Sequence, residues 1–238
     1  MEKDFMDKRT KHFIGLTGNQ LKIIALIAMT IDHIGNLIFP SLLWLRFIGR
    51  LAFPIFAYMI AEGARYTKNK KKYLGMMLGL GIACQLVYFF SMHSLYQCIL
   101  ITFSLSIILI YSLDHAFKRR TADAWILFAL VFIAVFFIVH ILPKFTVQTD
   151  YDVDYGIWGV LFPVFVYLGG QNKWAKFGLS IVPLIFLAVT FTYQIYAFAA
   201  LPLLALYNGK RGTLNMKYLF YVYYPSHLAI IYGISILL

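Results

Sequence analysis

The chain has 238 residues, of which 61% are hydrophobic and only 13% charged, whereas soluble domains average about 45–50% and about 25%. A water-soluble domain of this size cannot bury so much apolar surface. Disorder is excluded because 18% of the residues are aromatic, and two cysteines cannot form a disulfide framework. The apolar stretches are continuous rather than alternating as in a membrane β-barrel. The composition therefore predicts an all-α, multi-pass membrane protein.

A polar, basic N-terminal segment (1–20) precedes the apolar stretches. We expect it to lie at the cytoplasmic membrane interface, with Thr17 or Asn19 capping the first helix. About nine spans are predicted, within a range of 8–10, at 21–38, 42–64, 73–91, 95–113, 124–142, 155–169, 175–191, 193–207 and 218–238. A straight span needs about 20 apolar residues. The sixth to eighth segments are shorter and each contains a proline, so tilted, broken or re-entrant helices are expected there.

The basic residues predict the orientation, because Lys and Arg collect in cytoplasmic loops. Eighteen of the 21 lie in the N-terminal segment, up to Lys22, and in alternate loops after it. The opposite loops are neutral or acidic, apart from Lys144. This pattern predicts a cytoplasmic N-terminus and an external C-terminus in the cell membrane. The net charge of +11 is then a topology signal, and no nucleic-acid partner is expected. No linker or repeat divides the chain, so 1–238 is treated as one domain.

Ionisable groups at membrane depth mark functional sites by default. Within the predicted spans these groups are Asp32, His33, Arg46, Arg50 and His227, with Glu62 nearer the cytoplasmic end of the second span. We expect Glu62 to pair with Arg65, three residues further along the same helix.

Helical geometry brings several of these residues to one region. The helical rise puts His33 about 16 Å beyond Lys22 and His227 about 13 Å into the last span, so the two histidines lie at comparable depth. Spacings of four and three residues put Lys22, His33 and Asn36 on one helix face. Asp32 points about 100° away and is expected to meet Arg46 or Arg50. Such a pair would equally serve as a simple clamp between two helices.

A buried histidine with a pKa near neutrality can act as a general base or a nucleophile. Reached by a donor from one side and an acceptor from the other, it would pass a chemical group across the membrane. The basic inner loops suit a donor that carries phosphates. The acidic outer loop suits a cationic or amine-bearing acceptor.

Three stretches at the two ends of the chain carry a family resemblance. They read LTGNQLKIIALIAMTIDHIGNLIFP at 16–40, RFIGRLAFPIFAYMIAEGARYTKNKKKYL at 46–74 and LFYVYYPSHLAIIYG at 219–233. In this order they resemble the TraX family, which is named for N-terminal acetylation of conjugative pilin. That family is similar to a broader group of membrane acyltransferases, including the acyltransferase-three sugar O-acetylases and the lysosomal heparan glucosaminide N-acetyltransferase.

The resemblance implies an acetyltransferase that takes its acetyl group from cytoplasmic acetyl-CoA. In the acyltransferase-three group the first helix carries Lys or Arg, ten further residues and a catalytic His, and Lys22 and His33 match that spacing. His33 would be the base or nucleophile, with Asp32 and His227 as further catalytic groups. The acceptor would be a peptide N-terminus, a small amine or a glycan hydroxyl.

Two further sets of residues complete the expected site, which contains no metal. The donor would be bound by basic side chains, namely Lys22, Arg46, Arg50, Lys71, Lys72, Arg119, Arg120, Lys210 and Arg211. Other side chains expected in the cavity are Asn36, Tyr58, Glu62 and Tyr224.

Two other functions are compatible with the same residues. Asp32, His33, Arg46 and His227 would equally form a proton relay in a proton-coupled transporter, although no inverted repeat is visible. A third hypothesis is a scaffold or export partner in a secretion system, and no sequence feature points to it. Thiol release from acetyl-CoA would distinguish the acetyltransferase from the transporter and from the scaffold.

Overall fold

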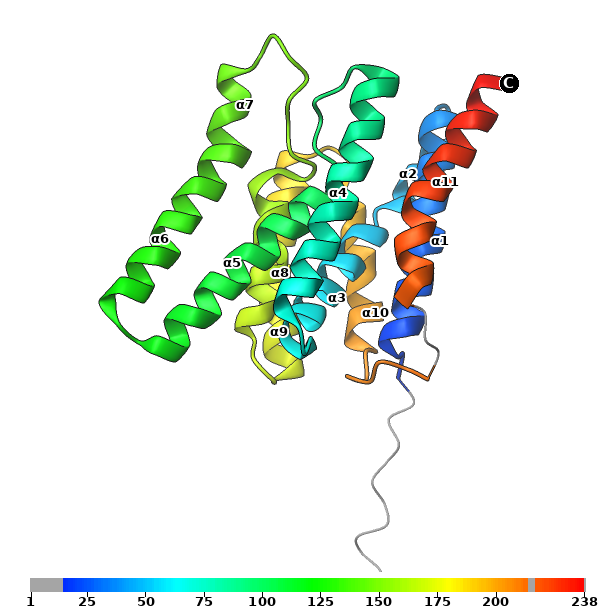
Figure 1. Cartoon of the computed structure of the whole chain (residues 1–238). Coiled ribbons are helices and arrows are strands. Elements are labelled where there is room, and N and C mark those ends of the chain that lie inside the picture. The colour runs from blue at the N-terminus through cyan, green and yellow to red at the C-terminus, as the bar shows by residue number, and fades with distance from the viewer. Residues whose placement is uncertain (1–14, 214–216, 238) are drawn as a thin grey trace, which may run out of the picture.

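In the computed structural model, which describes residues 15–213 and 217–237, the chain is a bundle of helices (Figure 1). Most of the predicted interfacial segment, residues 1–14, lies outside these ranges. The helices are α1 (Gly18–Leu37), α2 (Leu43–Gly49), α3 (Ala52–Tyr66), α4 (Lys70–Met92), α5 (Ile99–Arg119), α6 (Ala122–Phe136), π-helix η1 (Phe137–Ile141), α7 (Leu142–Phe145), α8 (Gly156–Leu168), α9 (Lys173–Thr190), 3-10 helix η2 (Gln194–Ala200), α10 (Leu201–Ala205) and α11 (Lys217–Leu237).

The predicted all-helical fold is confirmed for the described residues, whereas the number of spans is not. By length and composition, five stretches there are able to cross a membrane: Leu43–Tyr66, Lys70–Phe90, Ile99–Arg119, Ala122–Phe145 and Lys173–Thr190. Three further apolar helices are shorter, and polar residues lower the mean hydropathy of α1. Each of the nine predicted segments falls on helix, but not each is a long straight span.

Side chains at the helix starts explain where several helices begin. The Thr17 hydroxyl accepts a hydrogen bond from the Gln20 amide at 3.3 Å, and the Gln20 side chain accepts one from the Thr17 amide at 2.8 Å. This capping box confirms Thr17 as the N-cap of α1. Asn69 and Asn172 cap α4 and α9 in the same way, through side-chain oxygens that accept from backbone amides.

The three prolines of the short segments do not all interrupt the helix. α8 and α9 continue through Pro163 and Pro183. The eighth predicted segment is broken, as expected, because it begins as the 3-10 helix η2 and becomes α-helical only where Pro202 stands in the first turn of α10. A proline at that position lacks only a backbone donor that would be unpaired anyway.

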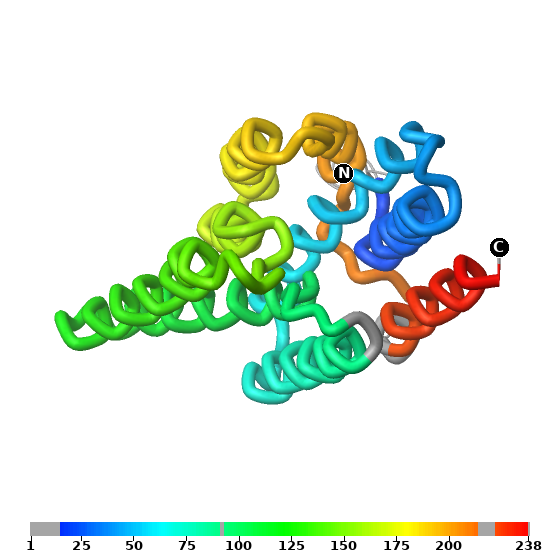
Figure 2. Tube along the Cα trace, turned by 90° about the horizontal axis from the view of Figure 1, so that it is seen from above, coloured from blue at the N-terminus to red at the C-terminus, as the bar shows by residue number. Residues whose placement is uncertain are grey.

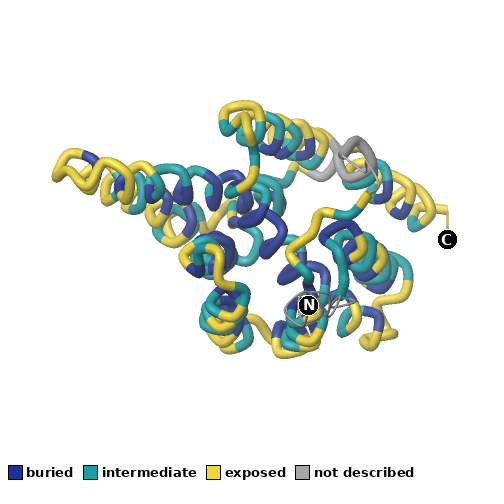
Figure 3. Tube along the Cα trace, turned by 90° about the horizontal axis from the view of Figure 1, so that it is seen from below, coloured by how far each residue is buried: buried dark blue, intermediate teal, exposed yellow. Residues whose placement is uncertain are grey.

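The centre of the bundle is α3, which packs against α1, α5 and α8 (Figure 2). Most of its side chains are buried, and Tyr58 is 1% exposed. By contrast, α6 and the end of α5 that leads to it extend away from the bundle, and most of α6 is exposed (Figure 3). The exposed side chains of α6 are almost all apolar, which is typical of a helix that faces lipid.

The two ends of the bundle, whose helix starts can be followed in Figure 1, differ in the charged residues they carry. The basic end, where α1, α4, α6, α9 and α11 begin, carries most of the Lys and Arg residues of the described chain. The acidic end, where α5 and α8 begin, carries the loops 93–98 and 146–155 with Asp150, Asp152 and Asp154. The basic loops and the neutral or acidic loops, which alternate along the chain, therefore lie at opposite ends of the bundle.

Two glycines allow α1 and α2 to pack closely. A Cβ added at Gly49 would lie 2.2 Å from Asp32 Oδ1, and one at Gly35 would lie 2.6 Å from the Leu45 Cβ. Close approach of the two backbones is therefore a requirement of this interface.

We expect Gly49→Ala to destabilise the protein by about 1–3 kcal/mol, because the added methyl group overpacks the contact with Asp32. The midpoint of thermal unfolding in detergent checks this. Gly79→Ala on the exposed face of α4 is the matched control, since nothing lies within 4 Å of its added Cβ. A Gly49→Ala protein as stable as this control would contradict the packing argument.

Candidate functional site

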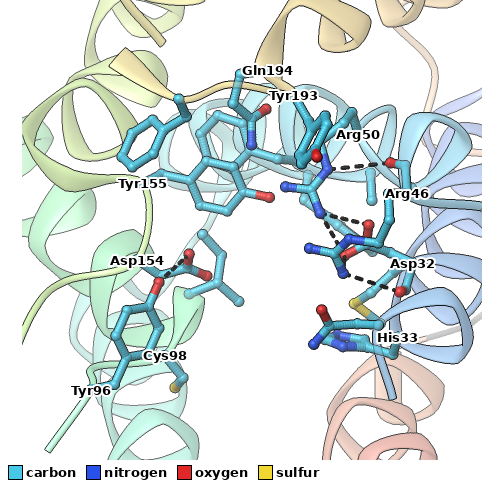
Figure 4. Close-up of a pocket in the computed structure, with 18 of the residues that line it drawn as sticks. Asp32, His33, Arg46, Arg50, Tyr96, Cys98, Asp154, Tyr155, Tyr193 and Gln194 are labelled. Atoms are coloured by element: carbon cyan, nitrogen blue, oxygen red, sulfur yellow. Dashed lines mark hydrogen bonds and ion pairs between the residues drawn. The ribbon is translucent and has the colours of Figure 1, made fainter. Parts of the chain in front are cut away.

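A cavity of about 460 Å³ lies between α1, α2, α3 and the loops of the acidic end (Figure 4). Its volume is within the range of small-molecule sites, about 300–1,000 Å³. Figure 4 shows polar side chains on opposite walls. The lining residues used below are Asp32, His33, Asn36, Arg46, Arg50, Tyr96, Cys98, Asp154, Tyr155, Tyr193, Gln194 and Tyr224.

One wall is built on an ion pair in which a single carboxylate holds two guanidinium groups. Arg50 donates to both oxygens of Asp32 at 2.6 and 2.7 Å, and Arg46 donates to Oδ2 at 3.1 Å. Arg46 also donates to the Asp32 backbone carbonyl at 3.2 Å. The predicted pairing of Asp32 with Arg46 or Arg50 is confirmed, and it involves both arginines. Two cations with one anion leave this wall, the arginine wall, with a formal surplus of one positive charge.

The two membrane histidines meet beside this wall. The ring centroids of His33 and His227 are 5.1 Å apart. α1 and α11 therefore bring the two histidines together, in agreement with the similar depth predicted for them. His227 Nδ1 lies 2.9 Å from the Tyr223 carbonyl oxygen, which can only accept, so Nδ1 carries the proton. The Nε2 atom then holds a lone pair, and it has no hydrogen-bond partner among the described residues. A neutral imidazole fixed in this tautomer is suited to accept a proton.

The opposite wall, the acidic wall, is formed by loop residues that sequence reasoning missed. Tyr96 donates to Asp154 Oδ1 at 2.8 Å, and the backbone of Asp154 is fixed by Gln97 and Thr102. Burial raises the pKa of Asp154 to about 6, although the Tyr96 hydroxyl and the Arg50 charge both act to lower it. The alternating aspartates Asp150, Asp152 and Asp154 predict the membrane orientation and a cationic acceptor, but nothing in their spacing identifies Asp154 as a cavity residue.

A third side of the cavity is contributed by η2 and the residue before it. Tyr193 and Gln194 lie there, between the arginine wall and Tyr155 (Figure 4). Gln194 is 3% exposed, and its Oε1 atom has no hydrogen-bond partner among the described residues. No pattern in the sequence indicates Gln194 as a cavity residue, because the helix break that produces η2 brings it to the cavity.

Of the other predicted cavity residues, Asn36 and Tyr224 line the cavity, whereas Tyr58 and Glu62 do not. Tyr58 packs in the core around α3 because it faces the centre of the bundle. Glu62 forms a buried ion pair with Lys176 at 2.6 Å and accepts from the Tyr207 hydroxyl at 3.3 Å.

The expected pairing of Glu62 with Arg65 is also wrong. The Arg65 guanidinium donates instead to the Tyr167 carbonyl and stacks over the Tyr167 ring, 4.1 Å from its centroid. Both side chains of α3 therefore find partners on α8 and α9 rather than on their own helix.

The basic residues predicted to bind the donor fall into two groups. Arg46 and Arg50 line the cavity. The others do not line it and lie toward the basic end, where Lys22 is half-buried and the remaining six are exposed: Lys71, Lys72, Arg119, Arg120, Lys210 and Arg211. A ligand that contacts both groups would have to extend along the bundle.

The fold and cavity together define a helical membrane protein with a polar site near one end of the bundle. The chain matches the family described as TraX protein over residues 17–235 and belongs to that family.

Two relatives show what the chain is similar to. The probable fimbrial assembly protein FimC, serogroup H1, of Dichelobacter nodosus is 27% identical over 253 residues, covering 92% of this chain and 95% of the relative. An uncharacterized protein, RP591, of Rickettsia prowazekii is 46% identical over 52 residues, covering 22% of this chain and 21% of the relative. No solved structure matches the chain.

We expect Asp32→Ala to destabilise the protein by about 3–5 kcal/mol, because it leaves two largely buried guanidinium groups without their counter-charge. The Asp32 side chain is 14% exposed and that of Arg50 is 12% exposed. A double-mutant cycle with Arg50→Ala, followed by thermal unfolding in detergent, should show less than additive effects. Asp152→Ala, which removes an exposed carboxylate, is the control. Additive effects would show that the pair does not hold α1 against α2.

Proposed function

We propose that this protein is a multi-pass membrane acyltransferase that moves an acetyl group from acetyl-CoA to an amine or hydroxyl acceptor. The supporting observation is the contact of His33 with His227 beside the cavity, with the unpartnered Nε2 atom of His227. Membership in the TraX family, which is named for pilin acetylation, supports the same activity. The name of the Dichelobacter relative suggests a fimbrial subunit as one acceptor.

The geometry suggests how the two histidines would divide the proton transfers. An imidazole of the pair accepts the proton of the acceptor as its nitrogen or oxygen bonds to the acetyl carbon. The carbon–sulfur bond of the thioester then breaks, and the imidazolium returns the proton to the leaving thiolate. The products are the acetylated acceptor and the free CoA thiol. Arg46, which is 22% exposed, would stabilise the negative oxygen that forms during transfer.

The charge of the two ends suggests the direction of transfer. We assign the basic end to the cytoplasm, because positive charge is retained on that side, which places the C-terminus outside. Phosphates of acetyl-CoA would contact the basic end. The cavity extends along α1 only as far as Met29, and Lys22 lies about 10 Å further toward the basic end by the helical rise. The pantetheine arm of acetyl-CoA would span this distance along α1 and α11.

We expect His33→Ala and His227→Gln each to lower kcat for acetyl-CoA-dependent thiol release by about 10²- to 10⁴-fold, as loss of a general acid–base group does. Thiol release by the purified protein with an amine peptide measures this. His115→Ala, on an exposed position of α5, is the matched control and should keep full activity. A His33→Ala protein that folds normally and retains full acetyl transfer would overturn the assignment.

We expect Lys22→Ala to weaken acetyl-CoA binding by about 10- to 100-fold, the effect of losing one charge-assisted hydrogen bond. Equilibrium binding of acetyl-CoA in detergent measures this effect. Lys144→Ala, which removes a charge from the acidic end, should leave binding unchanged. Equal affinity of the Lys22→Ala and wild-type proteins would contradict donor entry at the basic end.

A proton-coupled transporter is the second candidate, because the buried Asp32, His33 and arginine side chains meet in one cavity. It would show no saturable binding of acetyl-CoA in a well-folded sample. Substrate flux in proteoliposomes without acetyl-CoA would favour it over the acyltransferase.

A further inference from the structure

The two cysteines of the chain meet where α4 packs against the start of α5, and the proposed transfer chemistry uses neither of them. Both are buried. The Cys98 Sγ atom lies 3.9 Å from the carbonyl oxygen of Gly81 on α4, and Cys84 follows three residues later on the same helix face. The two thiols are in hydrogen-bond contact, with Cys84 donating to the sulfur of Cys98. Two thiols in contact are the reactants of a disulfide bond.

Close packing of α4 against α5 keeps the thiols together. A Cβ added at Gly81 would lie 2.8 Å from the Cδ1 atom of Ile101 and 3.3 Å from the Ile101 backbone nitrogen. Only a glycine lets the backbone of α4 come so near the first turn of α5. A disulfide bond needs a Cα separation of about 4.4–6.8 Å, and helices that approach this closely can provide it.

The environments of the two thiols differ. Cys98 is the N-cap of α5 and lines the cavity (Figure 4), whereas Cys84 does not line it. The hydrogen bond from Cys84 lowers the pKa of Cys98; burial opposes this shift, and the backbone amides of Leu100 and Ile101 add to it. A thiolate is the nucleophile in thiol–disulfide exchange. Cys98 is therefore the thiol that a reagent in the cavity meets first, and Cys84 is placed to react second.

A covalent bond between these thiols would act on the acidic wall. Cys98 ends the loop 93–98, in which Tyr96 donates to Asp154. The neighbouring Gln97 also forms backbone hydrogen bonds with the loop that carries Asp154, at 2.8 and 3.0 Å. Joining Cys98 to α4 would therefore tie the acidic wall to that helix.

We infer that Cys84 and Cys98 are a redox-active pair, which a disulfide oxidant converts to an intramolecular disulfide bond. The Cys98 thiolate attacks one sulfur of the oxidant, and the other sulfur leaves as a thiol with the proton that Cys98 gave up. Cys84 then attacks the Cys98 sulfur in this mixed disulfide, and its proton goes to the second departing sulfur. The two cysteines lose two electrons, and the disulfide of the oxidant is reduced to two thiols.

The orientation assigned above places this pair on the outer side of the membrane, where disulfide bonds form and persist. This is the one point that the inference takes from the proposed function. The chemistry of the pair itself needs neither acetyl-CoA nor the histidines.

Oxidised glutathione tests the inference on the full-length protein in detergent, after reduction with dithiothreitol and removal of the reductant. We expect the wild-type protein to lose both free thiols and two hydrogen atoms, without bound glutathione, and to recover the thiols in dithiothreitol. Cys84→Ser, which keeps a hydroxyl donor beside Cys98, should retain one glutathione on Cys98. Cys98→Ser is the matched control and should react at least tenfold more slowly, because Cys84 does not line the cavity. Intact mass and maleimide labelling after denaturation measure these outcomes.

The midpoint of thermal unfolding tests the covalent tie. The disulfide closes a loop from Cys84 to Cys98, so the oxidised wild-type protein should unfold about 6–12 °C above the reduced protein. The oxidant should not move the midpoint of Cys98→Ser.

Two free thiols in oxidant-treated, folded wild-type protein, or equal rates of glutathione attachment to the two variants, would overturn the inference. If one variant does not fold, the thiol count and the midpoint of the wild-type protein still decide the outcome. Because acetyl-CoA is absent from every sample, these results are independent of the acyltransferase. A protein that forms the disulfide but releases no thiol from acetyl-CoA would support the pair and overturn the acyltransferase.

Discussion

Three charged side chains, Asp32, Arg46 and Arg50, fix the relative position of α1 and α2, and the candidate site depends on this arrangement. An ionised carboxylate at membrane depth is unfavourable without a partner, and here two guanidinium groups contact it at 2.6–3.1 Å. Gly49 lets the helices approach closely enough for these bonds to form. With Asp32 held in this way, the next residue of α1, His33, is directed toward α11.

The same ion pair makes one wall of the cavity positively charged, whereas the opposite wall carries a carboxylate. One wall keeps a surplus positive charge, the opposite wall presents Asp154, and the third side presents the unpartnered oxygen of Gln194. The histidine pair lies beside the arginine wall. A reaction that joins an electrophilic carbonyl group to an amine needs complementary partners of this kind, together with a group that accepts a proton.

A similar division exists between the two ends of the bundle. The cavity lies near the acidic end, whereas the predicted donor-binding residues of the loops lie at the basic end. In an acyltransferase this separation would keep the donor and acceptor entrances on opposite sides of the membrane. The long axis of α1 would then connect the two sites, because it carries Lys22 at one end and His33 toward the other.

Sequence alone determined the helical membrane class, the segments that become helix, the segregation of charge and the pairing of Asp32 with arginine, because these depend on local hydropathy, helical period and charge. The sequence did not determine the partner of Glu62, which is Lys176 on α9. It also did not determine that Tyr58 is buried in the core. Asp154 and Gln194 reach the cavity through a loop and a broken helix. Only tertiary structure decided these contacts, because they join residues far apart in the chain whose spacing follows no helical period.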